Sequence, residues 1–152
     1  MATEAPPNGY SQSRDFSLLG EDVTLLPIFW VGETGSPVLV ASRCPSCGDL
    51  RFPPQELCPI DNETAMCARL GGRGRIYEVV RVALGPPGFP TPYWVGYVDL
   101  DEGIRIFGRI ETERAGSRDP AHGDVVVLEF TELSAQAGNE KRVLAPVFRQ
   151  QL

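Results

Sequence analysis

Two pairs of potential metal ligands constrain this chain more than any other feature. Cys44 and Cys47 form a Cys-x-x-Cys turn, and Cys58 and Asp61 repeat the same separation further along. A Cys-x-x-Cys turn aims both sulfur atoms at one point, so it supplies two of the four ligands of a tetrahedral zinc ion. The pattern predicts a zinc ribbon that is too small to fold by apolar burial. Bound metal would supply its stability, on the order of 10 kcal/mol at neutral pH.

The fourth ligand has two candidates. Spacing favours Asp61, because Cys58 and Asp61 repeat the separation of Cys44 and Cys47. Ligand chemistry favours Cys67, because closed structural zinc sites are usually built from Cys and His. Buried thiols and a disulfide framework are the other interpretations of these cysteines. The first twenty residues are polar and lack the apolar segment of a secretory signal, so we expect a cytoplasmic protein with reduced thiols.

Composition limits the size of the fold and the class of partner. A chain of 152 residues that is 42% hydrophobic can bury one modest core plus a small metal-held module. The 16 glycines and 14 prolines suit short strands joined by tight turns. No apolar run is long enough to cross a bilayer, so no membrane contact is expected. A net charge of -6, with Lys141 as the single lysine, argues against binding to nucleic acid.

Four zones follow one another along the chain. Residues 1–20 lack a periodic apolar pattern and predict a flexible N-terminal arm. Residues 21–37 predict a short helical segment that Pro27 interrupts. Residues 38–70 hold the zinc ribbon, and residues 71–152 hold the remaining strands.

The C-terminal half of the chain is predicted to be all strand. Gly/Pro-rich turns separate five apolar runs, at residues 75–84, 93–100, 104–111, 125–131 and 142–148. In the third run, isoleucines alternate with three charged residues and Phe107. Gly108 falls on the isoleucine face, where a strongly bent strand needs a missing side chain. The fold class is therefore mainly β, with a rubredoxin-like zinc ribbon followed by a five-stranded barrel of the OB type. An open sandwich is the alternative.

Several short motifs together resemble one known family. They are Phe29-Trp30, Cys44-x-x-Cys47-Gly48, Phe52-Pro53-Pro54, Cys58-Pro59, Gly72-Arg73-Gly74, Tyr93 to Leu100, Glu102-Gly103, Gly123-Asp124-Val125 and Pro146-x-Phe148. In this order they resemble the OB-fold zinc-ribbon accessory proteins of acyl-CoA metabolism. These are small partners of thiolases, including thiolases of aromatic-compound degradation, and of lipid-transfer-type aldolases. The resemblance runs from about residue 24 to the end of the chain.

The resemblance implies a role and a metal site. A thiolase-like subunit carries out the carbon–carbon chemistry, while the small subunit completes a hetero-oligomer and shapes access for an acyl-CoA. The zinc ion is structural. The family has a cysteine at the position of Asp61 and commonly an aromatic residue at that of Cys67. The resemblance thus supports Asp61 as the fourth ligand, or else a site with weakened metal affinity.

The residues also argue against catalysis by this chain. A thiolase needs an activated cysteine and further acid/base groups. Here His122 is the single histidine and sits beside Gly123 in a predicted turn, while the metal takes most of the cysteines. Two other functions compete with the accessory role. One is single-stranded nucleic-acid binding, which OB barrels also perform, and the other is a free-standing acyl-CoA carrier or hydrolase.

Three further groups of residues are candidates for binding. The stretch from Gly71 to Arg75 offers backbone amides and two guanidinium groups to a phosphate, although a flexible turn before the first barrel strand is the simpler interpretation. Acidic side chains from Asp99 to Glu102 predict a solvated hairpin rather than a calcium site. Aromatic residues at Phe89, Tyr93 and Trp94 predict a partner-binding surface.

Overall fold

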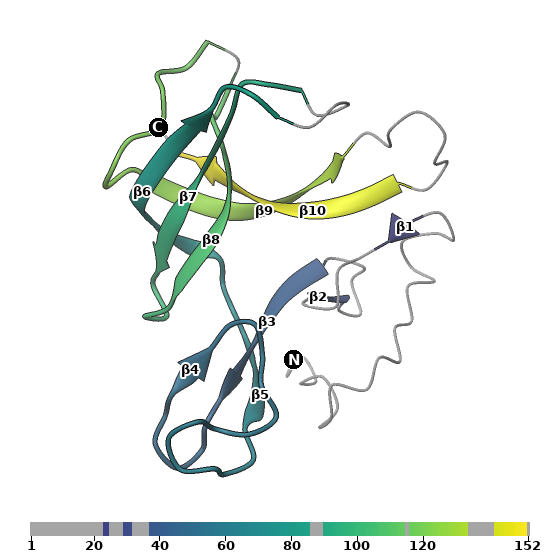
Figure 1. Cartoon of the computed structure of the whole chain (residues 1–152), viewed down its shortest axis with the longest axis vertical. Coiled ribbons are helices and arrows are strands. Elements are labelled where there is room, and N and C mark those ends of the chain that lie inside the picture. Colours follow the sequence, from purple (N-terminus) through teal and green to yellow (C-terminus); the bar gives the residue numbers. More distant parts are fainter. Residues whose placement is uncertain are drawn as a thin grey trace. The chain divides into compact units, whose positions relative to one another are not determined.

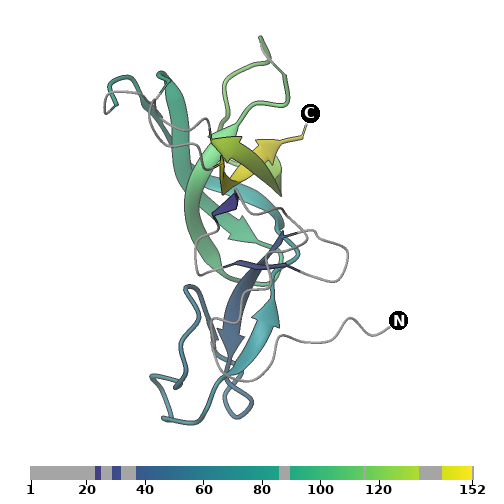
Figure 2. The same ribbon diagram turned by 90° about the vertical axis from the view of Figure 1, so that its right-hand side faces the viewer.

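The computed structural model describes residues 23–24, 29–31, 37–85, 90–114, 116–133 and 142–151. The chain divides into two compact units, Met1–Gly71 and Gly72–Leu152, here called the ribbon unit and the barrel unit. Both are built from strands, and the described residues contain no helix (Figures 1 and 2). None of the described segments is therefore a helix long and apolar enough to span a bilayer.

The ribbon unit is organised around one long strand. Its strands are β1 (Val23–Thr24), β2 (Phe29–Val31), β3 (Pro37–Arg43), β4 (Leu50–Arg51) and β5 (Met66–Arg69). The first half of β3 pairs antiparallel with β2, and its second half pairs antiparallel with β4 and β5. Leu39, Ala41 and Leu70 are buried, and with Val40 they make the small apolar core of this unit.

The short helical segment predicted over residues 21–37 is not confirmed. Val23–Thr24 and Phe29–Val31 are strands, and residues 21–22, 25–28 and 32–36 lie outside the described residues. Two effects favour strand over helix here. Pro27 removes a helix-forming N–H, and the aromatic and β-branched residues of β2 suit pairing with β3. The predicted N-terminal arm, residues 1–20, also lies outside the described residues.

The barrel unit is a closed five-stranded barrel. Its strands are β6 (Arg73–Val82), β7 (Tyr93–Leu100), β8 (Arg105–Glu111), β9 (Val125–Leu133) and β10 (Arg142–Gln150). They pair in the order β10-β8-β7-β6-β9, and a β9–β10 pairing closes the ring (Figure 1). Only the β8–β10 pair is parallel among the pairings of the ring. The predicted OB-type barrel is confirmed, in preference to an open sandwich.

Side chains that alternate to the inner face of the strands fill the barrel. The interior is apolar, with buried Ile76, Val98, Leu100, Ile106, Ile110, Val126, Val147 and Phe148. Gly108 occupies an inward position, and a Cβ atom there would lie 2.9 Å from the ring of Phe148. The missing side chain that the sequence predicted at Gly108 therefore makes room for a core aromatic residue.

Candidate metal centre

The first knuckle of the ribbon connects β3 to β4. The backbone N–H of Cys44 donates to the carbonyl of Asp49 at 2.9 Å, and the N–H of Gly48 donates to the carbonyl of Cys44 at 3.0 Å. Gly48 has a φ of 77°, a left-handed conformation that favours glycine. These bonds hold the turn closed with Cys47 at its tip.

The second knuckle is closed by the same two backbone hydrogen bonds as the first. The N–H of Cys58 donates to the carbonyl of Glu63 at 2.8 Å, and the N–H of Asn62 donates to the carbonyl of Cys58 at 2.9 Å. Asn62 has a φ of 61° and thus takes the conformation of Gly48. Asparagine is among the few non-glycine residues that adopt it readily. Asp61 therefore occupies in the second knuckle the place of Cys47 in the first.

The two knuckles bring four potential ligands together. One ligand atom from each of Cys44, Cys47, Cys58 and Asp61 lies within 4.8 Å of the others. The Cys47 and Cys58 sulfurs are 3.5 Å apart, and the Cys44 sulfur is 3.3 Å from the nearer Asp61 oxygen. Tetrahedral zinc with 2.3 Å bonds holds its sulfur ligands about 3.8 Å apart. Three sulfurs and one oxygen at this spacing fit a zinc ion.

Backbone amides support two of the sulfur ligands. The N–H of Cys47 points to the Cys44 sulfur, and the N–H of Ile60 points to the Cys58 sulfur, each at 3.5 Å. Both of these sulfurs belong to buried residues, whereas Cys47 is exposed. Amide N–H groups stabilise a thiolate, so the buried pair is prepared for a cation.

The electrostatics of the cluster distinguish its carboxylate from its thiols. The pKa of Asp61 is lowered to about 2, first by the Glu63 N–H, which donates to Oδ1 at 3.1 Å, and then by the cysteine thiols. The pKa of Cys47 is raised to about 12. A backbone hydrogen bond from Asp49 favours its thiolate, but desolvation and the neighbouring ligand atoms outweigh that bond. A divalent cation would reverse this shift, because it stabilises the thiolate directly.

Cys67, the other candidate for the fourth ligand, is not part of this cluster. It lies in β5, where its backbone pairs with Ser42 of β3. Burial raises the pKa of its thiol, and Arg69 and a backbone hydrogen bond offset this only partly. The spacing argument for Asp61 thus agrees with the geometry of the ribbon.

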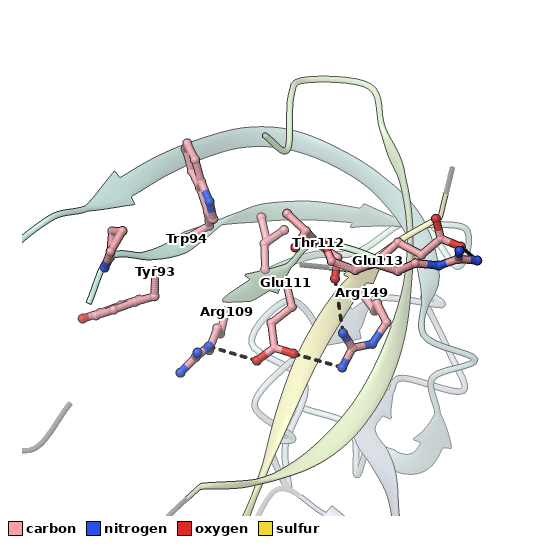
Figure 3. A pocket seen from close by; sticks show the side chains of 10 residues that line it. Tyr93, Trp94, Arg109, Glu111, Thr112, Glu113 and Arg149 are labelled. Carbon is pink, nitrogen blue, oxygen red and sulfur yellow. Dashed lines mark hydrogen bonds and ion pairs between the residues drawn. The ribbon is translucent and has the colours of Figure 1, made fainter. Parts of the chain in front are cut away.

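A second candidate site lies on the barrel unit. A cavity of about 420 Å³ opens between the start of β7, the end of β8 and the end of β10. Figure 3 shows Tyr93, Arg109 and Glu111 on one side of the strands, with Trp94 pointing to the other. Tyr93 and Trp94, two of the three aromatic residues predicted for partner binding, line this cavity. Phe89, the third, lies outside the described residues.

The charges in this cavity neutralise one another. Arg149 contacts Glu129 at 2.6 Å and Glu111 at 3.0 Å, and donates to the Thr112 carbonyl at 3.2 Å. Arg109 forms an ion pair with Glu111 at 3.3 Å, without hydrogen-bond geometry at its Nε atom (Figure 3). The Arg109 guanidinium also lies 5.6 Å from the centre of the Tyr93 ring. The lining therefore holds structural ion pairs, not an assembled acid and base.

The remaining predicted residues take structural roles. Nδ1 of His122 lies 2.6 Å from the carbonyl oxygen of Tyr77, next to the turn at Gly123. Asp99 forms two hydrogen bonds with Arg105, as expected of a solvated hairpin.

The Gly71 to Arg75 stretch leads directly into a strand. Arg73 and Arg75 both lie in β6, where Arg73 is 3.7 Å from Asp101 and Arg75 donates to the Gly123 carbonyl at 3.0 Å. This geometry suits the start of a barrel strand more than a phosphate loop.

The sequence argument missed an exposed aromatic group on the barrel. Tyr77, Tyr97 and Phe107 project outward from β6, β7 and β8. Their signal in the sequence is the alternation of each strand. Phe107, for example, stands between the buried Ile106 and the inward-facing Gly108.

Comparisons with known proteins agree with both units. Residues 34–59 match the model for the ChsH2 rubredoxin-like zinc ribbon domain, and residues 68–131 match that for the ChsH2 C-terminal OB-fold domain. The chain is 31% identical to benzoylsuccinyl-CoA thiolase subunit BbsA of Thauera aromatica, over 73% of this chain and 75% of that protein. It is 34% identical to a DUF35 domain-containing scaffold protein of Methanocaldococcus jannaschii, over 47% of this chain and 54% of that protein.

A solved structure shares the fold and part of the sequence. The chain superposes on a chain of the Ltp2-ChsH2(DUF35) aldolase with a TM-score of 0.59 and 31% identity. The match covers 76% of this chain and 86% of that one.

Proposed function

Because the chain belongs to the zinc-ribbon and OB-fold family that includes benzoylsuccinyl-CoA thiolase subunit BbsA, we propose that it is an accessory subunit of a thiolase-superfamily acyl-CoA enzyme. In this role it makes and breaks no bonds. It completes a hetero-oligomer whose partner subunit carries the catalytic residues of a thiolase or aldolase.

The observation that carries the proposal is a four-ligand metal centre in the ribbon unit of a chain whose other unit is a closed barrel. Cys44, Cys47, Cys58 and Asp61 would hold one zinc ion, which supplies a four-ligand crosslink between the two knuckles when bound. Four protein ligands leave no open position for a substrate or an activated water, so such a zinc ion is structural. A metal crosslink of this kind would hold the two knuckles in one arrangement, which suits a subunit that docks.

The distribution of reactive side chains supports the same division of labour. Three cysteines belong to the metal cluster, and the thiol of Cys67 is disfavoured as a nucleophile because its pKa is raised. His122 directs Nδ1 at a backbone carbonyl. Thiolysis through a covalent acyl-enzyme needs a thiolate beside a base, and a partner with such a pair would provide it.

The names of the relatives point to the class of substrate. The relative in Thauera aromatica is named for benzoylsuccinyl-CoA, an aromatic acyl-CoA, and a second relative of that name, in Geobacter metallireducens, is 35% identical over 52% of this chain. We propose that the complex acts on an acyl-CoA, with a role in aromatic-compound degradation. This chain would help to shape the access of the acyl-CoA to the partner's site.

Copurification tests the accessory role. The chain, tagged and expressed in its native host, should bring down a thiolase-superfamily protein in fixed stoichiometry, as measured by native mass spectrometry. Removal of the chain should abolish or strongly reduce acyl-CoA cleavage by that partner. The proposal fails if no such protein copurifies, or if the purified chain turns over an acyl-CoA without a partner.

A further inference from the structure

The outer surface of the barrel unit carries an exposed apolar group. Tyr77 and Val80 project from β6, Tyr97 from β7 and Phe107 from β8, and these four residues are here called the barrel face. Each is between 44% and 58% exposed, although aromatic and branched apolar side chains usually find cover. Arg105 and His122 cover part of the Tyr77 ring, and the four side chains remain about half exposed.

Strand register makes these residues one continuous surface. Tyr97 pairs directly with Phe107 across β7 and β8, and their rings meet edge to face with centres 5.2 Å apart. Val80 pairs with Val95, which follows the same outward alternation as Tyr97. An irregularity in the register of β6 between Ile76 and Glu78 leaves Tyr77 outside the pairing. Tyr77 keeps the outward alternation of Arg73 and Arg75, and the bulge places Glu78 outward as well, where its carboxylate-bearing side chain lies opposite Tyr97.

Ion pairs border the barrel face at both ends. At one end Arg105 forms two hydrogen bonds with Asp99, at 2.6 and 3.0 Å, and its guanidinium stacks 3.3 Å from the centre of the Tyr77 ring. At the other end Arg109 pairs with Glu111. Each of these arginines is therefore neutralised by a carboxylate on the same surface.

This charge pattern decides between two classes of partner. OB barrels bind single-stranded nucleic acid on this side, through stacking aromatics and a positively charged groove. Here the aromatics are present, but the bordering arginines are already paired and the chain carries a net charge of -6. An apolar centre with a rim of polar and paired charged groups is instead the anatomy of a protein interface.

The size of the barrel face also fits the centre of a protein interface. Three aromatic residues and one valine at about half exposure amount to about 400 Å² of apolar surface. That is at the size where a contiguous patch on a monomer is often functional, and about half of the roughly 800 Å² that one partner buries in a standard complex. The remainder would come from the polar rim.

We propose that the barrel face is the surface on which the thiolase-superfamily subunit docks. This inference rests on the proposed function, and it adds the place of contact. The partner would present a complementary apolar surface, with polar groups opposite Arg105 and Glu111. Burial of Phe107 and Tyr97 at the centre would supply much of the affinity, as buried aromatics do at other interfaces.

A charge placed at the centre of the face tests the proposal. Phe107→Glu should weaken binding of the copurified thiolase-superfamily partner by about a hundredfold or more in calorimetric titration, because the interface would bury an unpaired carboxylate. Gln151→Glu adds the same charge at an exposed position after β10 and should change the dissociation constant less than about threefold. Phe107→Ala is the milder variant, with an expected loss of about tenfold or more. Thermal unfolding of each isolated variant should match wild type.

The outcomes separate this inference from the proposed function. If wild type binds the partner and Phe107→Glu binds equally well, the docking surface lies elsewhere and the inference is wrong, while the accessory role stands. If wild type binds no partner, the proposed function itself fails. Two results would assign the face to another occupant and overturn the inference. One is a wild-type homodimer in native mass spectrometry that Phe107→Glu dissociates, and the other is binding of a labelled oligo(dT) that Phe107→Glu abolishes.

Discussion

At the scale of single residues, Asp61 is the position where the two knuckles differ in chemistry. The backbone bonds around Cys58 and Asp61 repeat those around Cys44 and Cys47, and Asn62 reproduces the left-handed turn of Gly48. An oxygen ligand is harder than a thiolate, so this position weakens the preference of the site for soft metals. The carboxylate also needs no deprotonation at neutral pH, because the pKa of Asp61 is about 2.

The assignment of the fourth ligand is tested by zinc content. Asp61→Ala should lower zinc affinity by about a hundredfold or more, because loss of a direct ligand exceeds the 10–100-fold effect of losing a second-layer partner. Cys67→Ala is the matched control and should retain one zinc per chain, measured by elemental analysis after dialysis against a weak chelator. The opposite pattern would make Cys67 the ligand.

Asp61→Cys provides the complementary change. It would give the second knuckle the Cys-x-x-Cys spacing of the first and should bind zinc more tightly than wild type in competition with a chromophoric chelator. Equal or weaker binding would show that the knuckle does not present this side chain to the metal.

Asp124 connects the β8–β9 loop to the barrel, and loss of its carboxylate should destabilise the fold. Its carboxylate accepts two hydrogen bonds from Arg118, at 2.8 and 2.5 Å, and others from the Ala121 N–H and the buried Gln150. Asp124→Asn should therefore lower the free energy of unfolding by about 1–3 kcal/mol at pH 7. Urea unfolding followed by the amide signals of β9 and β10 would measure it.

The same residue predicts a pH dependence. The pKa of Asp124 is lowered to about 2, chiefly by hydrogen bonding to Arg118, from an ordinary value of 3.8. A lowered pKa gives stability that is fully present above the unfolded value and is lost as the pH falls through the folded value. The difference between wild type and Asp124→Asn should be constant above about pH 5 and shrink towards pH 2. A difference independent of pH would contradict this ionic role.

At the scale of elements, two glycines allow a strand to approach its neighbours closely. A Cβ atom at Gly96 would overlap the carbonyl of Glu78 across β6 and β7, whereas at Gly108 it would press on the Phe148 ring at 2.9 Å. Gly96→Ala should be the more destabilising, by about 3 kcal/mol or more, because backbone yields less than a side chain. Gly108→Ala should cost about 1–3 kcal/mol. Thermal unfolding would show which of the two variants is less stable. A larger loss of stability in Gly108→Ala would show that the paired strands β6 and β7 move apart to accommodate the added methyl group.

The elements differ in how far the sequence predicts them. Residues 93–100 form a strand with the predicted bounds, because alternation and flanking prolines and glycines define both ends. The helix predicted near Pro27 is not confirmed, because a local pattern does not include the pairing of β2 with β3. β5 was missed, since Met66–Arg69 has no β-branched residue and owes its form to pairing with β3.

The site was more predictable than its surroundings. Spacing favoured Asp61 over Cys67, and the structure brings Asp61 together with Cys44, Cys47 and Cys58, because a metal knuckle is encoded locally. The barrel face was not predicted. Tyr77, Tyr97 and Phe107 come from three strands, and they form a surface only through the register of β6 with β7 and of β7 with β8. The alternation in a sequence predicts which side chains of one strand point outward, but it does not predict which outward side chains of different strands contact one another.

At the scale of the whole molecule, the two units should respond differently to removal of metal. The core of the ribbon unit is small, whereas the barrel closes its own ring of hydrogen bonds around a larger core. Treatment with a strong zinc chelator should therefore expose the amides of β3, β4 and β5 to hydrogen exchange. The amides of β6 to β10 should keep their protection. Simultaneous loss in both units would contradict separate stabilisation, and full retention in both would remove the structural role of the metal.

The parallel pairing of β8 with β10 has a consequence for synthesis on the ribosome. Arg109 to Glu111 find their partners in Val147 to Arg149, which belong to the last strand of the barrel to be made. All residues of the knuckles precede residue 70, so the ribbon can capture its ion while the remaining strands are still being translated. The barrel cannot close until β10 has left the exit tunnel, and until then the nascent chain presents open strand edges to chaperones.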